Sequence, residues 1–120
     1  MKNKRTSHAA GLAAETVAAC VLRCKGYRIL ARRYKTPVGE IDLVARRRNT
    51  LAFVEVKARQ RMDEALAAAT PAMRARIVRA AGHFVAGRPD LAVLDMRFDL
   101  VAVAPPFYWR HLDNAWRPAA

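Results

Sequence analysis

The chain has 120 residues, of which 53 % are apolar, so it is long enough for one domain with its own core and too apolar for a disordered protein. Its formal net charge of +12 at pH 7 favours a polyanionic partner, either nucleic acid or an anionic membrane surface. No stretch is long and uncharged enough to span a membrane, and Glu15 interrupts the apolar run near the start. We therefore expect neither a membrane protein nor a signal peptide.

The first expected element is a helix. A flexible basic arm, residues 1–7, precedes a single domain over residues 8–117, and Thr6 or Ser7 can cap a helix that ends at about Lys25. The predicted core stripe of this helix is Ala10, Ala13, Val17, Cys20, Val21 and Cys24. The two cysteines lack the two further ligands of a zinc site, so we expect buried free thiols, which suit a reducing cytoplasm.

Three strands should follow as a meander, over Tyr27–Tyr34, Val38–Arg46 and Thr50–Gln60. Side chains alternate between the two faces of a strand. On the third strand, one face is the apolar set Ala52, Val54, Val56 and Ala58, and the other carries Phe53, Glu55, Lys57 and Arg59. On the second strand, the expected core face is Ile41, Leu43 and Ala45, and the opposite face is Glu40, Asp42 and Val44.

Charged residues in the middle of these strands are the main functional signal. A hairpin between the second and third strands brings Asp42 close to Glu55, with Lys57 and the weaker candidate Glu40 nearby. Clustered carboxylates repel one another, and a hard cation such as Mg²⁺ or Mn²⁺ relieves the repulsion through oxygen ligands. A neighbouring lysine can hold the attacking water, so the pattern predicts metal-assisted phosphodiester hydrolysis. The alternative is a structural ion pair between Lys57 and Glu55 or Asp42.

Glu15 stands almost alone in the apolar surface of the first helix. A buried carboxylate without a partner is costly, so Glu15 needs water, a cation or a hydrogen-bond donor. It either faces the patch around Asp42 and Glu55 or lies on an exposed face in solvent.

The second half of the chain begins with Met62–Ala69, expected as a loop or a short helical turn. Thr70 and Pro71 then start a helix that runs to about Ala86. Its predicted core stripe is Met73, Ile77, Ala80, Ala81 and Phe84, and His83 is expected to be a surface residue. Candidate contacts to a nucleic-acid backbone, with an ordinary solvated surface as the alternative, are Arg59, Arg61, Arg74, Arg76 and Arg79.

Two strands complete the chain, one over Arg97–Ala104 and a short edge strand over Phe107–Leu112. Arg97 and Asp99 are interpreted as a structural pair. The aromatic residues Tyr108, Trp109 and Trp116 are expected to pack over the sheet, with stacking on bases as the alternative. The order α-β-β-β-α-β(-β) predicts an α/β fold, a single domain whose central mixed β-sheet has helices on both sides.

The motifs along the chain resemble a known family. They are G-x-x-A-E at Gly11–Glu15, G-E-I-D-L at Gly39–Leu43, F-V-E-V-K at Phe53–Lys57, R-F-D at Arg97–Asp99 and the tail His111–Trp116. The chain is similar over most of its length to the YraN-like family of uncharacterised bacterial proteins, which resemble archaeal Holliday-junction resolvases. Its Asp42 and Glu55-x-Lys57 resemble the PD-(D/E)XK nuclease motif, which implies a restriction-endonuclease-like core.

This resemblance implies roles for the matching residues. Asp42, Glu55 and the Val56 carbonyl would ligate Mg²⁺ or Mn²⁺, Lys57 would assist the attacking water, and Glu15 would support the site. Two positions depart from the pattern. Many relatives carry Asn where this chain has Arg33, and a lysine early in the second helix where this chain has Met73.

Three functions are compatible with these observations. The first is a metal-dependent endonuclease on DNA, with branched or structured DNA favoured, and DNA favoured over RNA. The second is a non-catalytic nucleic-acid-binding module of the same fold, and the third is an assembly scaffold. Resolvase-like enzymes commonly act as dimers, so the resemblance allows a homodimer, although no segment of the sequence marks a dimer face.

Overall fold

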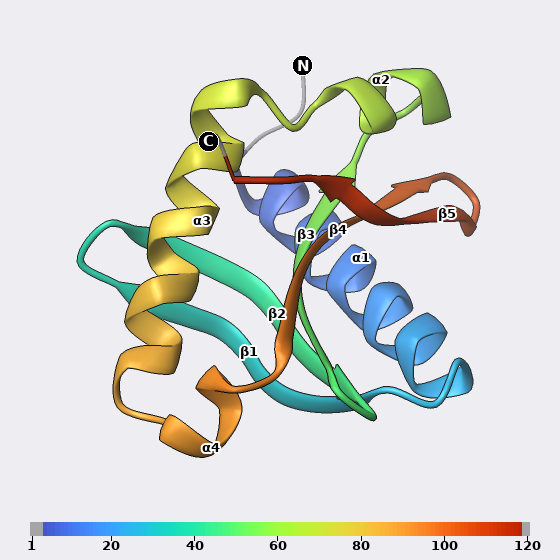
Figure 1. Ribbon diagram of the computed structural model, residues 1–120. Coiled ribbons are helices and arrows are strands. Elements are labelled where there is room, and N and C mark those ends of the chain that lie inside the picture. Colours follow the sequence, from blue (N-terminus) through green and yellow to red (C-terminus); the bar gives the residue numbers. More distant parts are fainter. Residues whose placement is uncertain (1–3, 119–120) are drawn as a thin grey trace.

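The computed structural model describes residues 4–118, which form four helices and five strands (Figure 1). In chain order these are α1 (Lys4–Cys24), β1 (Arg28–Thr36), β2 (Gly39–Arg47), β3 (Thr50–Ala58), α2 (Met62–Ala67), α3 (Pro71–Ala86), α4 (Pro89–Ala92), β4 (Asp95–Ala104) and β5 (Tyr108–Trp116). Residues 1–3 of the predicted basic arm lie outside the described residues. No helix within the described part of the chain is both long enough and apolar enough to cross a membrane.

The five strands form one mixed sheet in the order β1-β2-β3-β4-β5. The first three strands are an antiparallel meander, as predicted, β4 runs parallel to β3, and β5 pairs antiparallel with β4. A parallel pair needs a long crossover, and the segment containing α2, α3 and α4 supplies it. The expected α/β domain with a central mixed sheet is therefore confirmed.

Two separate cores cover the two faces of the sheet. On one face α3 packs through Ile77, Ala80, Ala81 and Phe84 against Phe53, Phe98 and Leu100. On the other face α1 packs through Ala14, Ala18 and Leu22 against Leu43, Val54 and Val101. Figure 1 shows α1 and α3 on opposite sides of the strands. Because both faces are covered, β3 and β4 are apolar over most of their length, as central strands require.

The helix α3 matches its prediction closely. It begins at Pro71, and the side chain of the preceding Thr70 accepts a hydrogen bond from the Met73 N–H at 3.2 Å. This is the N-cap arrangement expected from the Thr-Pro pair. The segment before it, left open between loop and helical turn, forms the short helix α2.

The buried face of α1 differs from the prediction. Among residues 11–24 of α1, the buried ones are Ala14, Glu15, Ala18, Ala19, Val21 and Leu22. Ala13, Cys20 and Cys24 of the predicted stripe are exposed, and the side chain of Ala10 lies outside those described. The expectation of buried thiols was therefore wrong, although both cysteines are free. The helix also begins at Lys4, before the expected cap. Alanine and other apolar residues of α1 lie on nearly every side of the helix, so their periodicity does not indicate which face is buried.

The C-terminal aromatic residues also depart from expectation. The strand β5 is longer than predicted and reaches Trp116, whose ring stacks on Phe98 with centroids 5.8 Å apart. Phe107, Tyr108 and Trp109 are instead exposed large apolar side chains, with exposed fractions of 74 %, 67 % and 44 %. Packing over the sheet is thus confirmed for Trp116 and wrong for Tyr108 and Trp109. These residues lie in or just after the turn at the edge of the sheet, where no other element of the described chain covers their side chains.

Candidate active site

The candidate site is built on a break in the pairing of β2 and β3. Regular pairing ends at Leu43 and Val54. One residue earlier, the side chain of Asp42 replaces a backbone acceptor of β2: its Oδ2 accepts a hydrogen bond from the Val56 N–H of β3 at 2.8 Å. Ile41 packs in the α3 core and Leu43 in the α1 core, so alternation also fails at Asp42. The prediction that Ile41 and Leu43 share a face was therefore wrong.

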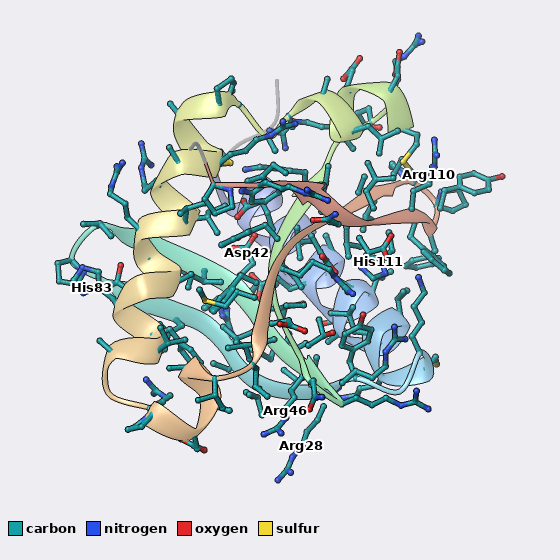
Figure 2. All side chains as sticks on the ribbon, viewed as in Figure 1. Arg28, Asp42, Arg46, His83, Arg110 and His111 are labelled. Atoms are coloured by element: carbon teal, nitrogen blue, oxygen red, sulfur yellow. The ribbon has the colours of Figure 1, made fainter. Side chains whose placement is uncertain are left out.

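This break places the Asp42 carboxyl between two strands instead of on an open face. Burial and the negative charge of Glu55 raise the pKa of Asp42 to about 7, although the Val56 N–H and Lys57 favour the ionised form. The interaction with the Glu55 side chain therefore favours the protonated form of Asp42. The predicted closeness of Asp42 and Glu55 is confirmed. Figure 2 shows Asp42 in the interior of the domain.

Lys57 completes the pattern on β3. Its Nζ lies 3.0 Å from Glu55 Oε1, and the two side chains are only 13 % and 9 % exposed. Residues two apart on a strand share a face, so the E-x-K spacing is what brings these groups together. The contact is the one expected of a structural ion pair, and it also holds an ammonium group beside the Asp42 carboxyl.

Glu15 reaches the same region from α1. Its residue is 9 % exposed, and its pKa is raised first by burial and then by the charge of Asp42, while Arg33 opposes the shift. Arg33 Nε lies 3.7 Å from Glu15 Oε1, an atom that is buried without a hydrogen-bond partner. Of the two alternatives for Glu15, the structure supports the position facing Asp42. Glu40, the weaker candidate, has an exposed side chain, and its charge contributes less than that of Asp42 to the raised pKa of Glu15.

The donor set can be compared with the needs of a divalent cation. Mg²⁺ in proteins uses one or two carboxylates with further oxygen ligands, and Asp42 and Glu55 supply two that lie together. The Val56 N–H points toward β2, and a strand residue directs its carbonyl to the same side, so the Val56 carbonyl faces the break. Among the side chains that the structure describes, residues 11–118, no three His, Cys, Asp or Glu groups are already arranged around a single point. The raised pKa of Asp42 and the unpartnered oxygen of Glu15 are the features that a cation would relieve.

The predicted phosphate-binding arginines fall into two groups, one after β3 and one on α3. Arg59 and Arg61 are exposed after β3, and Arg61 Nε and Nη2 donate to the Asp63 carboxylate at 3.1 and 3.2 Å. Arg76 and Arg79 are exposed on α3. Arg74 is half-buried, with its guanidinium 5.7 Å from the centre of the Trp116 ring. His83 lies on the outer side of α3, away from Asp42 (Figure 2).

A second buried charge network lies around Asp99, and it is separate from the candidate site. The fully buried carboxylate accepts two hydrogen bonds from Arg97 at 2.8 Å, one from His111 Nε2 at 2.8 Å and one from the Asn114 N–H at 3.0 Å. Arg97 also donates to the Tyr27 hydroxyl, and Lys25 Nζ donates to His111 Nδ1 at 2.8 Å. These contacts support the structural interpretation of Arg97 and Asp99. They join the start of β1 to β4 and β5.

Sequence reasoning overlooked one feature beside the site. Arg33 adopts φ = 49°, a left-handed conformation that is rare outside Gly, Asn and Asp. Its pairing neighbours Arg32 and Tyr34 are matched with Leu43 and Ile41, so Arg33 lies opposite Asp42. Propensity gives no signal for this in an arginine. The Asn of the resembling sequences at this position was the available clue.

Comparison with known proteins identifies the family. The profile of "Uncharacterised protein family UPF0102" matches residues 14–103. A UPF0102 protein of Parvibaculum lavamentivorans is 55 % identical over 108 residues, which cover 90 % of this chain and 81 % of the relative. Similar proteins occur in Rhodopseudomonas palustris strain HaA2, with 55 % identity over 106 residues (88 % and 83 % covered), and in Nitrobacter winogradskyi, with 51 % over 107 residues (89 % and 91 % covered). The chain belongs to UPF0102.

UPF0102 is the YraN-like group to which the sequence motifs pointed, so that resemblance is confirmed. The matched span of UPF0102 begins one residue before Glu15 and includes Asp42, Glu55 and Lys57. It ends at Val103, before the turn that carries Phe107 and before Trp109 on β5.

Proposed function

We propose that this UPF0102 protein is a metal-dependent endonuclease that hydrolyses phosphodiester bonds in DNA, with branched or structured DNA as the favoured substrate. The observation that carries the proposal is the position of Asp42. Its carboxyl fills a break in the sheet between Glu15 on one element and Glu55 on another, with Lys57 at 3.0 Å from Glu55. An Asp beside an E-x-K strand resembles the core of PD-(D/E)XK nucleases.

Each residue has a chemical role in this proposal. Asp42, Glu55 and the Val56 carbonyl would hold Mg²⁺ or Mn²⁺, which supplies a Lewis acid for the phosphate and lowers the pKa of a bound water. Lys57 donates hydrogen bonds to the attacking water or to the charge that develops on the phosphate. Glu15 accepts a hydrogen bond from a water near Asp42, which orients that water. Removal of the functional group of Asp42, Glu55 or Lys57 should abolish hydrolysis.

The nucleic-acid partner is supported by charge. A net charge of +12 on 120 residues favours binding to phosphates, and the exposed Arg59, Arg76 and Arg79 are side chains that can contact a backbone. The free thiols Cys20 and Cys24 suit a reducing compartment, so a cytoplasmic location is part of the proposal.

The test uses purified wild type with Asp42→Asn, Glu55→Gln and Lys57→Met variants, assayed with Mg²⁺ and Mn²⁺ on linear duplex, branched duplex and single-stranded DNA. The exposed Asp113→Asn substitution on β5 is the matched control. Wild type and the control should cleave at least one substrate, and the three site variants should not, while all keep cooperative unfolding. Equal cleavage by wild type and all three site variants would remove the proposal.

A non-catalytic nucleic-acid-binding module is the second candidate. It is favoured by the closed Glu55–Lys57 pair and by the low exposure of both side chains. Calorimetry with Mg²⁺ and Mn²⁺ separates the two functions. Binding that is lost in the Asp42→Asn/Glu55→Gln double variant supports the nuclease, whereas nucleic-acid binding without metal binding supports the second candidate.

A further inference from the structure

An apolar groove runs between α1 and the turn that joins β4 to β5, outside the site described above. It consists of two adjoining hollows of about 230 and 460 Å³ that share Val17 and Phe107. The first hollow is lined by Ala13, Ala14, Val17, Ala58, Arg59, Gln60 and residues 103–107, and the second by Thr16, Val17, Cys20, Val21, Cys24, Lys25, Phe107 and Trp109. In Figure 1 this turn is the hairpin end beside the label β5, and α1 lies next to it.

The walls of the groove carry aromatic rings that the fold leaves uncovered. Phe107 and Trp109 are well exposed, and both line the second hollow. A large apolar side chain in water is unfavourable, so exposed rings in a concave surface commonly mark a binding site. The exposure of Cys20 and Cys24, which was not expected, is part of the same apolar surface.

The charges at the groove favour an anionic occupant. A basic side chain lies in each hollow, Arg59 in the first and Lys25 in the second, and no acidic residue is among those that line them. The ammonium of Lys25 lies 5.6 Å from the centre of the Trp109 ring. Flat aromatic faces combined with cationic groups are the features that bind single-stranded nucleic acids, whose bases stack and whose phosphates need positive charge. A second copy of this chain would bring a further charge of +12 to the interface.

The groove adjoins the candidate active site. Its wall residue Ala58 directly follows Lys57 on β3 but faces α1, whereas Lys57 shares the opposite face of the sheet with Phe53. On α1, the wall residue Ala14 directly precedes Glu15. The strand β4, which leads to Phe107, pairs Ala102 with Lys57. Five residues of extended chain span at most about 17 Å, so the rings lie within a few nucleotides of Lys57.

We propose that this groove binds a single-stranded nucleic-acid segment, with bases stacked on Phe107 and Trp109 and phosphates held by Arg59 and Lys25. The inference names the form of nucleic acid that reaches the proposed nuclease site, and to that extent it rests on the proposed function. The substrate would then contain unpaired nucleotides within a few nucleotides of the scissile phosphate, as branched DNA does.

Binding is measured in EDTA, where metal-dependent cleavage cannot occur, with a (dT)12 oligonucleotide and a blunt 12-base-pair duplex as probes. The chain has two tryptophans, and Trp116 is only 8 % exposed, so stacking at the groove should quench mainly the fluorescence of Trp109. The same occupancy should slow the reaction of Cys20 and Cys24 with a maleimide. Both effects are expected with (dT)12 and not with the blunt duplex.

Variants assign the binding to the rings. Phe107→Ala and Trp109→Ala should each weaken (dT)12 binding by about tenfold or more, as expected when one stacked base loses its aromatic partner. Tyr108→Ala is the matched control, because this ring is 67 % exposed, between Trp109 at 44 % and Phe107 at 74 %, but does not line the groove. This variant should bind as the wild type does. Unfolding curves establish that all three variants are folded.

Several outcomes would overturn the inference. The first is an absence of quenching by (dT)12, and the second is equal protection of the thiols by (dT)12 and by the blunt duplex. The third is a loss of (dT)12 binding in Tyr108→Ala as large as in Trp109→Ala. The fourth is thiol protection that rises with protein concentration alone, which would identify a second copy as the occupant. The Asp42→Asn/Glu55→Gln variant separates this inference from the proposed function, because it should keep (dT)12 binding. If wild type binds (dT)12 with quenching but cleaves no substrate, only the proposed nuclease function is rejected. If it cleaves duplex DNA but shows no quenching by (dT)12, only the proposed single-strand binding by the groove is rejected.

Discussion

Asp42 is the residue whose chemistry is most changed by the fold. Its pKa of about 7, against an ordinary value of 3.8, means that the folded protein favours the protonated carboxyl. The unfolded chain releases this proton at lower pH, so the contribution of Asp42 to stability decreases as pH rises from about 4 to about 7 and is constant above that. At about 1.4 kcal/mol for each pKa unit, the loss is at most about 4 kcal/mol.

The Asp42→Asn variant tests this shift. Asn is neutral at every pH. Its side chain can accept a hydrogen bond from the Val56 N–H and can donate one to Glu55, so it imitates protonated Asp42. The variant should be more stable than wild type by a few kcal/mol at pH 8, and the difference should shrink toward pH 4. Urea unfolding in EDTA at both pH values measures it, with exposed Asp113→Asn as control. A difference independent of pH would contradict the raised pKa.

Arg33 gives a second prediction at this scale, because its φ of 49° is costly for most side chains. A left-handed conformation costs roughly 1–2 kcal/mol for an ordinary residue and less for Asn or Gly. The contact with Glu15 is long and Arg33 is half-exposed, so its loss matters little. We expect Arg33→Asn to match or exceed the stability of wild type and Arg33→Val to lose about 1 kcal/mol or more in urea unfolding. Equal stability of the two variants would show that the backbone there is not strained.

Among the elements, β4 and β5 are held together by the network around Asp99. Burial opposes ionisation of this carboxyl, but hydrogen bonds from His111, Arg97 and the Asn114 N–H keep its pKa below the ordinary value. Its stabilising contribution is therefore present above about pH 4 and is lost as pH falls through the lowered pKa.

Asp99→Ala would leave the Arg97 guanidinium and His111 without their acceptor. Removing one partner of a buried ion pair costs about 3–5 kcal/mol, so this variant should unfold at much lower urea concentration than wild type at pH 7. The exposed Asp113→Ala substitution on the same strand pair should change stability by less than about 0.5 kcal/mol. Similar losses in both variants would mean that the Asp99 network is not a structural clamp.

The elements also show how far the sequence alone leads. The period-2 pattern of β3 and the Thr70-Pro71 start of α3 are local signals, so the meander, the closeness of Asp42 to Glu55 and the Glu55–Lys57 pair were predictable. The buried face of α1 was not, because an alanine-rich helix offers several equivalent stripes. The break at Asp42 was not, because it depends on contacts between β1, β2 and β3 that alternation along one strand does not describe. The exposure of Phe107 and Trp109 depends on where the edge turn ends relative to α1, which no local pattern specifies.

At the scale of the whole molecule, the net charge of +12 leads to a test of nucleic-acid binding itself. A protein that neutralises phosphates releases counterions, so the logarithm of its affinity falls linearly with the logarithm of salt concentration, by about 0.9 for each contact with duplex DNA. An assembly scaffold would show little affinity and little dependence on salt. Wild type should show a steep slope in fluorescence anisotropy with a labelled branched duplex in EDTA.

The position of the charges decides whether binding is specific to one side of the protein. Arg76 and Arg79 lie on α3, whereas Arg28 and Arg46 pair across β1 and β2 at the bottom of the domain in Figure 2, away from Asp42. Replacing either pair with Gln removes the same two charges, so a purely non-specific attraction would respond equally to both changes. If the α3 face contacts the backbone, Arg76→Gln/Arg79→Gln should reduce the salt slope by about 2, and Arg28→Gln/Arg46→Gln should reduce it far less. Equal reductions would assign binding to net charge alone, and the reverse order would place the DNA at the β1–β2 end, away from Asp42.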